Sequence, residues 1–96
     1  MVDRTAREYA VVWSGPEGDS SGRLIVHPDR FELAGRDATV PVLFSDLTSA
    51  SIDRTPAQRL RGLPVLFLRR RDGRSLRVAS LEGAGVLYEL VRLALP

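Results

Sequence analysis

The C-terminal stretch 80–96 carries the pattern that most restricts how this chain can fold. Drawn as a helix, it gathers nearly all of its apolar side chains on one broad arc. The arc contains Gly83, Val86, Leu87, Leu90, Val91, Leu93, Ala94 and Leu95. An arc this wide suits a helix that is sunk into a groove or lies across the mouth of a sheet. We expect Ser80 to be the N-cap and Glu82 to lie in the first turn.

Seven short segments before this helix have the composition or alternation of β-strands. They are 9–13, 23–27, 30–34, 39–44, 48–54, 64–70 and 75–79. Pro41 places the fourth strand near an edge or a bulge, and Asp72-Gly73 is a strong hairpin signal. The stretch 14–22, dense in turn formers, is predicted as a loop.

The break at Ser45-Asp46-Leu47 divides the predicted strands into four and three. Two bent antiparallel sheets that pack nearly at right angles fit this division, with the helix closing their open end. The chain of 96 residues, 44% of them hydrophobic, has enough apolar side chains for one modest core. We expect residues 1–7 to be a flexible N-terminus and residues 8–96 to be a single domain.

Five parts of this pattern match one known superfold. They are residues 22–26, 28–33, 40–47 and 52 and the helix 87–95. On these residues the chain resembles the pleckstrin-homology (PH) superfold, particularly the small bacterial PH-like and GRAM-like domains. The resemblance implies a PH-like split barrel of seven antiparallel strands in two near-orthogonal sheets, capped by a C-terminal α-helix. It also implies a scaffold that offers a sheet edge or a helix groove to a peptide or to a second copy.

Charge gives a second candidate feature. All 14 basic residues are arginines, and the net charge is only +2. The region 54–77 holds eight of them, with only Asp53 and Asp72 as neighbouring acids. The candidate anion- or partner-binding residues are Arg54, Arg59, Arg61, Arg69, Arg70, Arg71, Arg74 and Arg77. The alternative is a solvated sheet face. Since the 55–63 loop and the 71–74 turn are expected at opposite ends of the sheet, these arginines need not form one patch.

No catalytic constellation is recognisable in the sequence. His27 is the only histidine and precedes a proline, and there is no cysteine, so no zinc site of ordinary composition can be assembled. We therefore expect no enzyme activity, no cofactor and no metal. Base stacking requires exposed aromatic residues; Phe67 is expected in the core, and Tyr88 is the aromatic expected to be most exposed.

The sequence predicts a non-enzymatic PH-like protein-interaction or self-assembly module, with a protein partner or a homo-oligomer. Candidate surfaces are the edge strand 39–44, the arginine-rich sheet, and a helix face formed by Tyr88, Glu89 and Arg92. The alternative is a binder of anionic ligands, either lipid headgroups or nucleic acid phosphates, through residues 54–77. Without a long apolar run or a signal-peptide core, we expect a cytoplasmic protein, or one peripheral to the membrane.

Overall fold

The computed structural model describes residues 7–16 and 18–95 of the chain. The strands in this part are β1 (Glu8–Gly15), β2 (Gly18–Val26), β3 (Arg30–Ala34), β4 (Thr39–Leu43), β5 (Leu47–Asp53), β6 (Val65–Arg70) and β7 (Ser75–Ser80). Two short 3-10 helices, η1 (Phe44–Asp46) and η2 (Pro56–Gln58), lie in the connections before and after β5. The α-helix α1 (Gly85–Ala94) follows the last strand.

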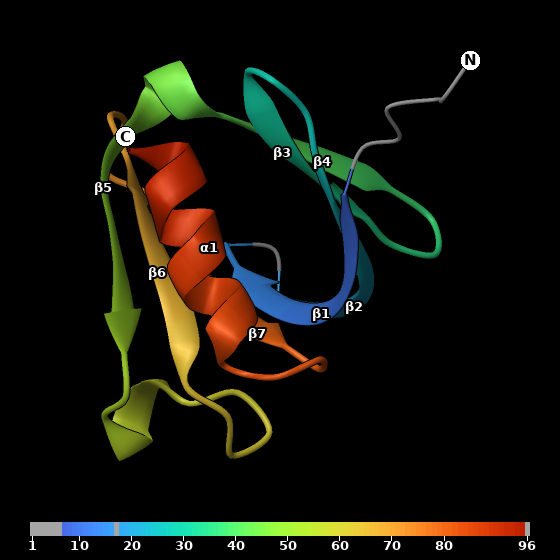
Figure 1. Ribbon diagram of the computed structural model, residues 1–96, viewed down its shortest axis with the longest axis vertical. Helices are drawn as coiled ribbons and strands as arrows, with labels where there is room; N and C mark the ends of the chain where they lie inside the picture. The colour runs from blue at the N-terminus through green and yellow to red at the C-terminus, as the bar shows by residue number, and fades with distance from the viewer. Residues whose placement is uncertain (1–6, 17, 96) are drawn as a thin grey trace.

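The seven strands form one sheet in the order β4-β3-β2-β1-β7-β6-β5, and all neighbours are antiparallel. Figure 1 shows this sheet curling into a half-barrel with α1 lying inside the curve. β1 links the two parts of the sheet, because it pairs with β2 on one side and with β7 on the other. The prediction of a mainly β domain with seven antiparallel strands and one C-terminal helix is therefore confirmed.

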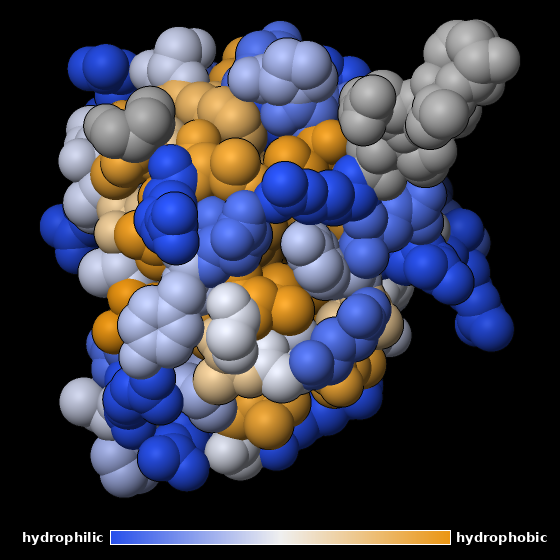
Figure 2. Space-filling model, in the orientation of Figure 1, coloured by the Kyte–Doolittle hydropathy of each residue, from blue (hydrophilic) through white to orange (hydrophobic). Residues whose placement is uncertain are grey.

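The core lies between the concave side of the sheet and α1. Side chains alternate along each strand, so every second residue faces this side. The largest fully buried side chains are Phe31, Leu24, Leu33, Leu66, Leu68, Leu87 and Leu90. Burying one leucine stabilises a fold by about 1.5–3 kcal/mol, so the two leucines of α1 make the helix an integral part of the structure. The polar side of α1 remains exposed, and Figure 2 shows apolar surface between polar groups on this face.

A second, smaller cluster lies on the convex side of the sheet. Val12, Val65 and Ala79 are buried there beneath Leu60, and Leu63 packs against them. The two leucines flank a tight turn, in which the Leu60 N–H donates to the Leu63 carbonyl (3.1 Å) and the Leu63 N–H donates to the Leu60 carbonyl (2.9 Å). The connection between β5 and β6 is therefore packed onto the convex face.

The helix begins later than the sequence predicts, and Ser80 is not its N-cap. Ser80 is the last residue of β7 and lies opposite Val11 of β1. Gly83 has a φ of +112°, outside the range of a right-handed helix. α1 therefore begins at Gly85, and its N-cap Ala84 makes no side-chain capping bond.

Glu82 likewise lies before the helix and not in its first turn. Its carboxylate Oε2 accepts a 2.6 Å hydrogen bond from the N–H of Ala10 in β1. The N–H of Glu82 donates to Oγ of Ser80 at 3.0 Å. These contacts extend the β1–β7 pairing past the end of the strand. Pro96, the last residue of the predicted helix, lies outside the described residues.

The predicted loop 14–22 is also wrong, because this stretch is largely a β-hairpin. β1 continues to Gly15, which lies opposite Gly18 at the start of β2. The polar residues 19–21 are strand residues that pair with residues 12–14 of β1. Gly22 is required by a close approach, since a Cβ atom there would clash with the carbonyl oxygen of Ala34 in β3. Gly22, which the sequence predicts to lie in a loop, therefore serves the tight packing of two strands.

At the N-terminus, residues 1–6 of the predicted flexible segment lie outside the described residues. Arg7 is described, and its carbonyl accepts a 2.8 Å hydrogen bond from the N–H of Val26. Its guanidinium contacts Glu89 of α1 at 2.5 Å. No helix in the described part of the chain has the length and apolar character needed to cross a membrane.

Candidate binding surfaces

The eight arginines of the region 54–77 fall into three groups. The first group lies at the β6–β7 turn and includes the exposed Arg74. Here Arg70 donates through Nη2 to the carbonyl of Pro41 (3.2 Å), and Arg71 donates through Nε to the carbonyl of Ser45 (2.8 Å). These bonds tie the turn to β4 and to η1. Arg70 and Arg71 therefore have structural contacts of their own.

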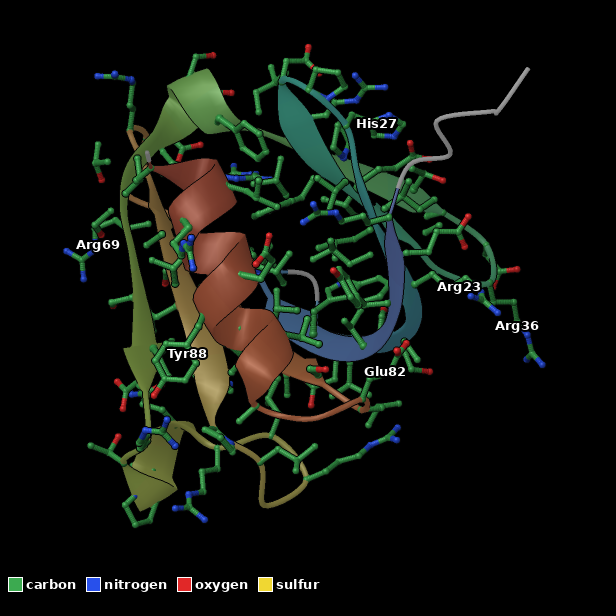
Figure 3. All side chains as sticks on the ribbon, in the orientation of Figure 1. Arg23, His27, Arg36, Arg69, Glu82 and Tyr88 are labelled. Atoms are coloured by element: carbon green, nitrogen blue, oxygen red, sulfur yellow. The ribbon has the colours of Figure 1, made fainter. Side chains whose placement is uncertain are left out.

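The second group belongs to the convex face. Arg69 is exposed, and Figure 3 shows it pointing away from α1. Arg77 is half-buried, donating through Nη1 to the carbonyl of Gln58 (3.1 Å) and through Nη2 to Oγ of Ser14 (3.2 Å). The side chain of Arg77 thus joins β7 to β1 and to the connection between β5 and β6.

That connection contributes two more arginines to the second group. Arg59 donates through Nε to the carbonyl of Arg54 (3.2 Å) and through Nη1 to the carbonyl of Gly62 (3.3 Å). Arg61 is exposed and has a φ of +52°, which lies in the left-handed region that residues other than glycine rarely adopt. The turn therefore presents an arginine at a position that favours glycine.

The side chain of Arg54 points away from the other seven arginines and reaches α1. It hydrogen-bonds the hydroxyl of Tyr88, and its guanidinium carbon lies 5.7 Å from the centre of the tyrosine ring. Tyr88 is 52% exposed, as the sequence predicts for it, and its ring projects from α1 in Figure 3. Arg92 is exposed on the same side of the helix, whereas Glu89 is already paired with Arg7. The hydrogen bond and the charge of Glu89 raise the pKa of the Arg7 guanidinium.

A cleft of about 660 Å³ opens between the β1–β2, β3–β4 and β6–β7 turns. Trp13 and Leu76 line it from the core. Arg36, Arg70 and Arg74 contribute positive charge, and Asp37 contributes one negative charge. Sequence reasoning missed Arg36 because a Gly-Arg-Asp sequence reads only as a turn. The cleft forms where three connections far apart in the chain meet, and no local pattern signals that meeting.

Phe67 does not belong to the core, contrary to the prediction. It lies between Leu66 and Leu68, which are buried on the concave side, so alternation places it on the convex side. It is half-buried there and has Ser51 of β5 and Arg77 of β7 as direct cross-strand neighbours. The continuous apolar run 64–68 concealed which residues face outward.

The two edge strands of the sheet differ in their protection. β4 contains Pro41, which lacks a backbone N–H and whose carbonyl is occupied by Arg70. β5 has seven residues and no proline, and its only irregularity is a register shift between Leu47 and Ser49. In the described part of the chain β5 pairs only with β6, so its outer backbone groups have no strand partner.

The ionisable groups near these surfaces are mostly in local pairs. Asp53 accepts hydrogen bonds from Oγ1 of Thr55 (2.7 Å) and from its backbone N–H (2.9 Å), and both bonds lower the pKa of the carboxyl group. Nε2 of His27 lies 2.7 Å from Oε1 of Glu32. The described residues contain no group of three or more side chains able to bind a metal ion.

Comparison with known proteins gives likeness in fold alone. No protein-family model matches the sequence. No curated protein matches it either. Among solved structures, the chain is similar to the C-terminal domain of an unknown protein from Leishmania infantum, with a TM-score of 0.72 and 10% sequence identity. The match covers 94% of this chain and 83% of the Leishmania chain. At this identity the similarity supports the three-dimensional arrangement and says nothing of activity.

Proposed function

We propose that the protein is a non-enzymatic, PH-like interaction module that assembles with a second copy through the free edge of β5. The observation that carries the proposal is the contrast between a β4 edge blocked at Pro41 and a β5 edge whose pairing with β6 is regular from Ser49 to Asp53. The unpaired N–H and C=O groups of an edge strand are a template for a further strand. Strand addition is a recurring way for a sheet to bind a partner.

The two-sheet description of a PH-like split barrel is part of the same proposal. The strand order supports it, because the first four strands of the chain occupy one end of the sheet and the last three occupy the other. The β1–β7 pair joins these blocks, and α1 lies within their curve (Figure 1). The resemblance to PH-like domains implies that these two blocks act as two near-orthogonal sheets. The proposal places the module in the cytoplasm.

The sequence of β5 is compatible with antiparallel pairing to itself. In a pair centred on Ala50, Ser49 of one copy lies opposite Ser51 of the other, and Thr48 lies opposite Ile52. No like charges face each other across these positions. The helix face of Tyr88, Glu89 and Arg92 lies next to this edge through the contact of Tyr88 with Arg54 and can extend the interface.

The register can be tested by introducing charges that repel in one combination and attract in another. Ser49→Glu with Ser51→Glu places carboxylates directly opposite each other across the two-fold axis, which disfavours pairing. Ser49→Lys with Ser51→Lys does the same with positive charges. Because both serines are exposed, neither double variant removes a core contact. We expect each to have the mass of a monomer, 10.6 kDa, in light scattering, while the unmodified protein has twice that mass.

An equimolar mixture of the two double variants restores complementary charges and should restore the dimer. Thr39→Glu, an exposed change on the opposite edge strand, is the matched control and should remain dimeric. If the unmodified protein is a monomer at all accessible concentrations, self-assembly through β5 is wrong. If the mixture of variants stays monomeric, the proposed register is wrong.

The cleft favours a second candidate function, the binding of an anionic ligand such as a phosphorylated lipid headgroup. It brings Arg74 and Arg70 of the predicted region together with Arg36 around one opening. Guanidinium groups bind phosphate through paired hydrogen bonds. An NMR titration with a soluble inositol phosphate at physiological salt tests this function. Saturable shifts confined to the cleft and lost in Arg36→Gln with Arg74→Gln would support it, and shifts that vanish with salt would exclude it.

A further inference from the structure

The cleft between the β1–β2, β3–β4 and β6–β7 turns has an apolar base. Trp13 and Leu76, which are both almost fully buried, form this base, and Pro16, Ala38 and Val40 also line the cleft. Val40 is half-buried and Pro16 is exposed, so part of the apolar lining faces water. The volume of about 660 Å³ lies within the range of about 300–1,000 Å³ that is typical of small-molecule pockets.

Two glycines keep the space above this base open. A Cβ atom on Gly35 would lie 3.5 Å from the indole ring of Trp13, and a Cβ atom on Gly15 would lie 2.9 Å from Cδ1 of Leu76. Both glycines line the cleft, so a larger residue at either position would occupy part of it. Neither glycine has a positive φ, so the backbone conformation does not require glycine at these positions. The missing side chains are instead what leaves room in the cleft.

Arg70 carries the positive charge of the cleft that no neighbouring carboxylate offsets. Arg36 is followed by Asp37, and Figure 3 shows Arg36 pointing away from the body of the molecule. Arg74 has Asp72 beside it, with Nε 3.8 Å from the carboxylate. Among the described residues, Arg70 forms no ion pair. Three arginines against two carboxylates leave the cleft with an excess of one positive charge, located at Arg70.

The side chain of Arg70 is also held in place. It is half-buried, and its Nη2 donates to the carbonyl of Pro41 at 3.2 Å. That bond uses one of the five N–H donors of a guanidinium group, so the remaining donors can bind a carboxylate. A single carboxylate matches the excess charge of the cleft, whereas a headgroup with several phosphates would bring more negative charge than the cleft offsets.

The apolar base of the cleft lies on the face of the sheet and not at its edge. Trp13 is paired with Ser20 of β2 and with Val78 of β7, so strand pairing occupies both sides of its backbone. A peptide that binds by adding a strand needs unpaired backbone groups, and Trp13 offers none. A hydrocarbon chain needs no hydrogen-bond partner and is stabilised simply by leaving water.

We propose that the cleft binds a medium-chain fatty acid, with the carboxylate on Arg70 and the hydrocarbon chain over Trp13, Leu76 and Val40. This proposal rests on the second candidate function, the binding of an anion in the cleft, and names the class of ligand. Isothermal titration calorimetry of the whole chain with decanoate, below its micelle concentration and at physiological salt, tests it. Decanoate should bind up to about tenfold more tightly than octanoate, because two more CH₂ groups leave water. Acetate, which lacks the chain, and decanol, which lacks the charge, should bind more weakly.

Three variants test the parts of the site. Arg70→Gln should weaken decanoate binding by about tenfold, because it removes charge-assisted hydrogen bonds to the carboxylate. Gly35→Ala should also weaken binding, because its methyl group occupies part of the cleft while its contact with Trp13 remains an ordinary one. Arg69→Gln removes the same charge from an exposed position outside the cleft and is the matched control, with affinity close to that of the unmodified protein.

Several results would overturn the proposal. Acetate or decanol binding as tightly as decanoate would mean that the chain or the charge is irrelevant. Arg69→Gln losing as much affinity as Arg70→Gln would mean unspecific charge attraction. Binding of the inositol phosphate without binding of decanoate would leave the anion function of the cleft intact and refute the fatty acid, and if neither binds, both are wrong. Should Arg70→Gln fail to fold, Gly35→Ala decides, because an affinity equal to that of the unmodified protein would place the ligand outside the cleft.

Discussion

Gly22 is the residue whose replacement should do most to test the packing of the two hairpins. A Cβ atom added there would clash with the carbonyl oxygen of Ala34, and would lie 3.0 Å from its carbonyl carbon and 3.1 Å from Cα of Gly35. All three obstacles are backbone atoms, so no side-chain rotation relieves the contact. In Gly22→Ala, β2 and β3 must therefore separate near the Arg23–Ala34 pair.

The cost of that separation follows from two contributions. Overpacking a tight interior costs about 1–3 kcal/mol. Stretching or breaking one or two ladder hydrogen bonds adds about 0.5–1.5 kcal/mol each. We therefore expect Gly22→Ala to lower the free energy of unfolding by about 2–5 kcal/mol. A chain of this length is stabilised by about 5–14 kcal/mol in total, so the loss is a large fraction of it.

Urea unfolding followed by circular dichroism measures the effect. With an m-value of about 1–2 kcal/mol/M, the midpoint should fall by at least about 1 M. Gly85→Ala is the matched control, because no atom lies within 4 Å of the added methyl group and its φ is not positive. As the first residue of α1, it should gain up to about 1 kcal/mol. The close approach of β2 and β3 is refuted if Gly22→Ala unfolds within about 0.5 kcal/mol of the unmodified protein.

Two further predictions concern polar contacts that the sequence does not reveal. Glu82→Gln replaces a charged acceptor of the Ala10 N–H by a neutral one, and should lower the free energy of unfolding by about 1 kcal/mol in the same assay; an unchanged value would refute a stabilising role. Thr55→Ala removes the larger cause of the lowered Asp53 pKa, so carboxyl NMR should show that pKa rising toward its ordinary value. A lowered carboxyl pKa stabilises the fold at pH values above the unfolded-state pKa. The unmodified protein should therefore lose its stability advantage over Thr55→Ala as the pH falls through the folded-state pKa of Asp53. An Asp53 pKa that does not change in the variant would contradict this.

The β3 segment and the helix show how much a local pattern can predict. Phe31 and Leu33 alternate with polar residues, and the strand has the bounds that this alternation predicts. Leu87 and Leu90 are buried as their spacing on the helix requires. Such periodicity is a property of neighbouring residues and needs no knowledge of the rest of the chain.

The errors arose where residues far apart in the sequence decided the outcome. Ser80 has the composition of an N-cap, but pairing with Val11 of β1 extends β7 to include it. The polar residues 19–21 look like a loop, but β1 gives them a strand partner. In each case long-range backbone pairing overrode the local preference.

The sequence by itself therefore determined the presence and order of the seven strands, the buried face of the helix and the edge position of Pro41, because each depends on period or on the chemistry of one residue. Only the tertiary structure decided where the side chains converge. Arg36 meets Arg74 at a cleft, and Phe67 faces outward beside Arg77, because distant turns and strands are brought together there. A guanidinium group has several possible partners within reach, and the fold selects among them.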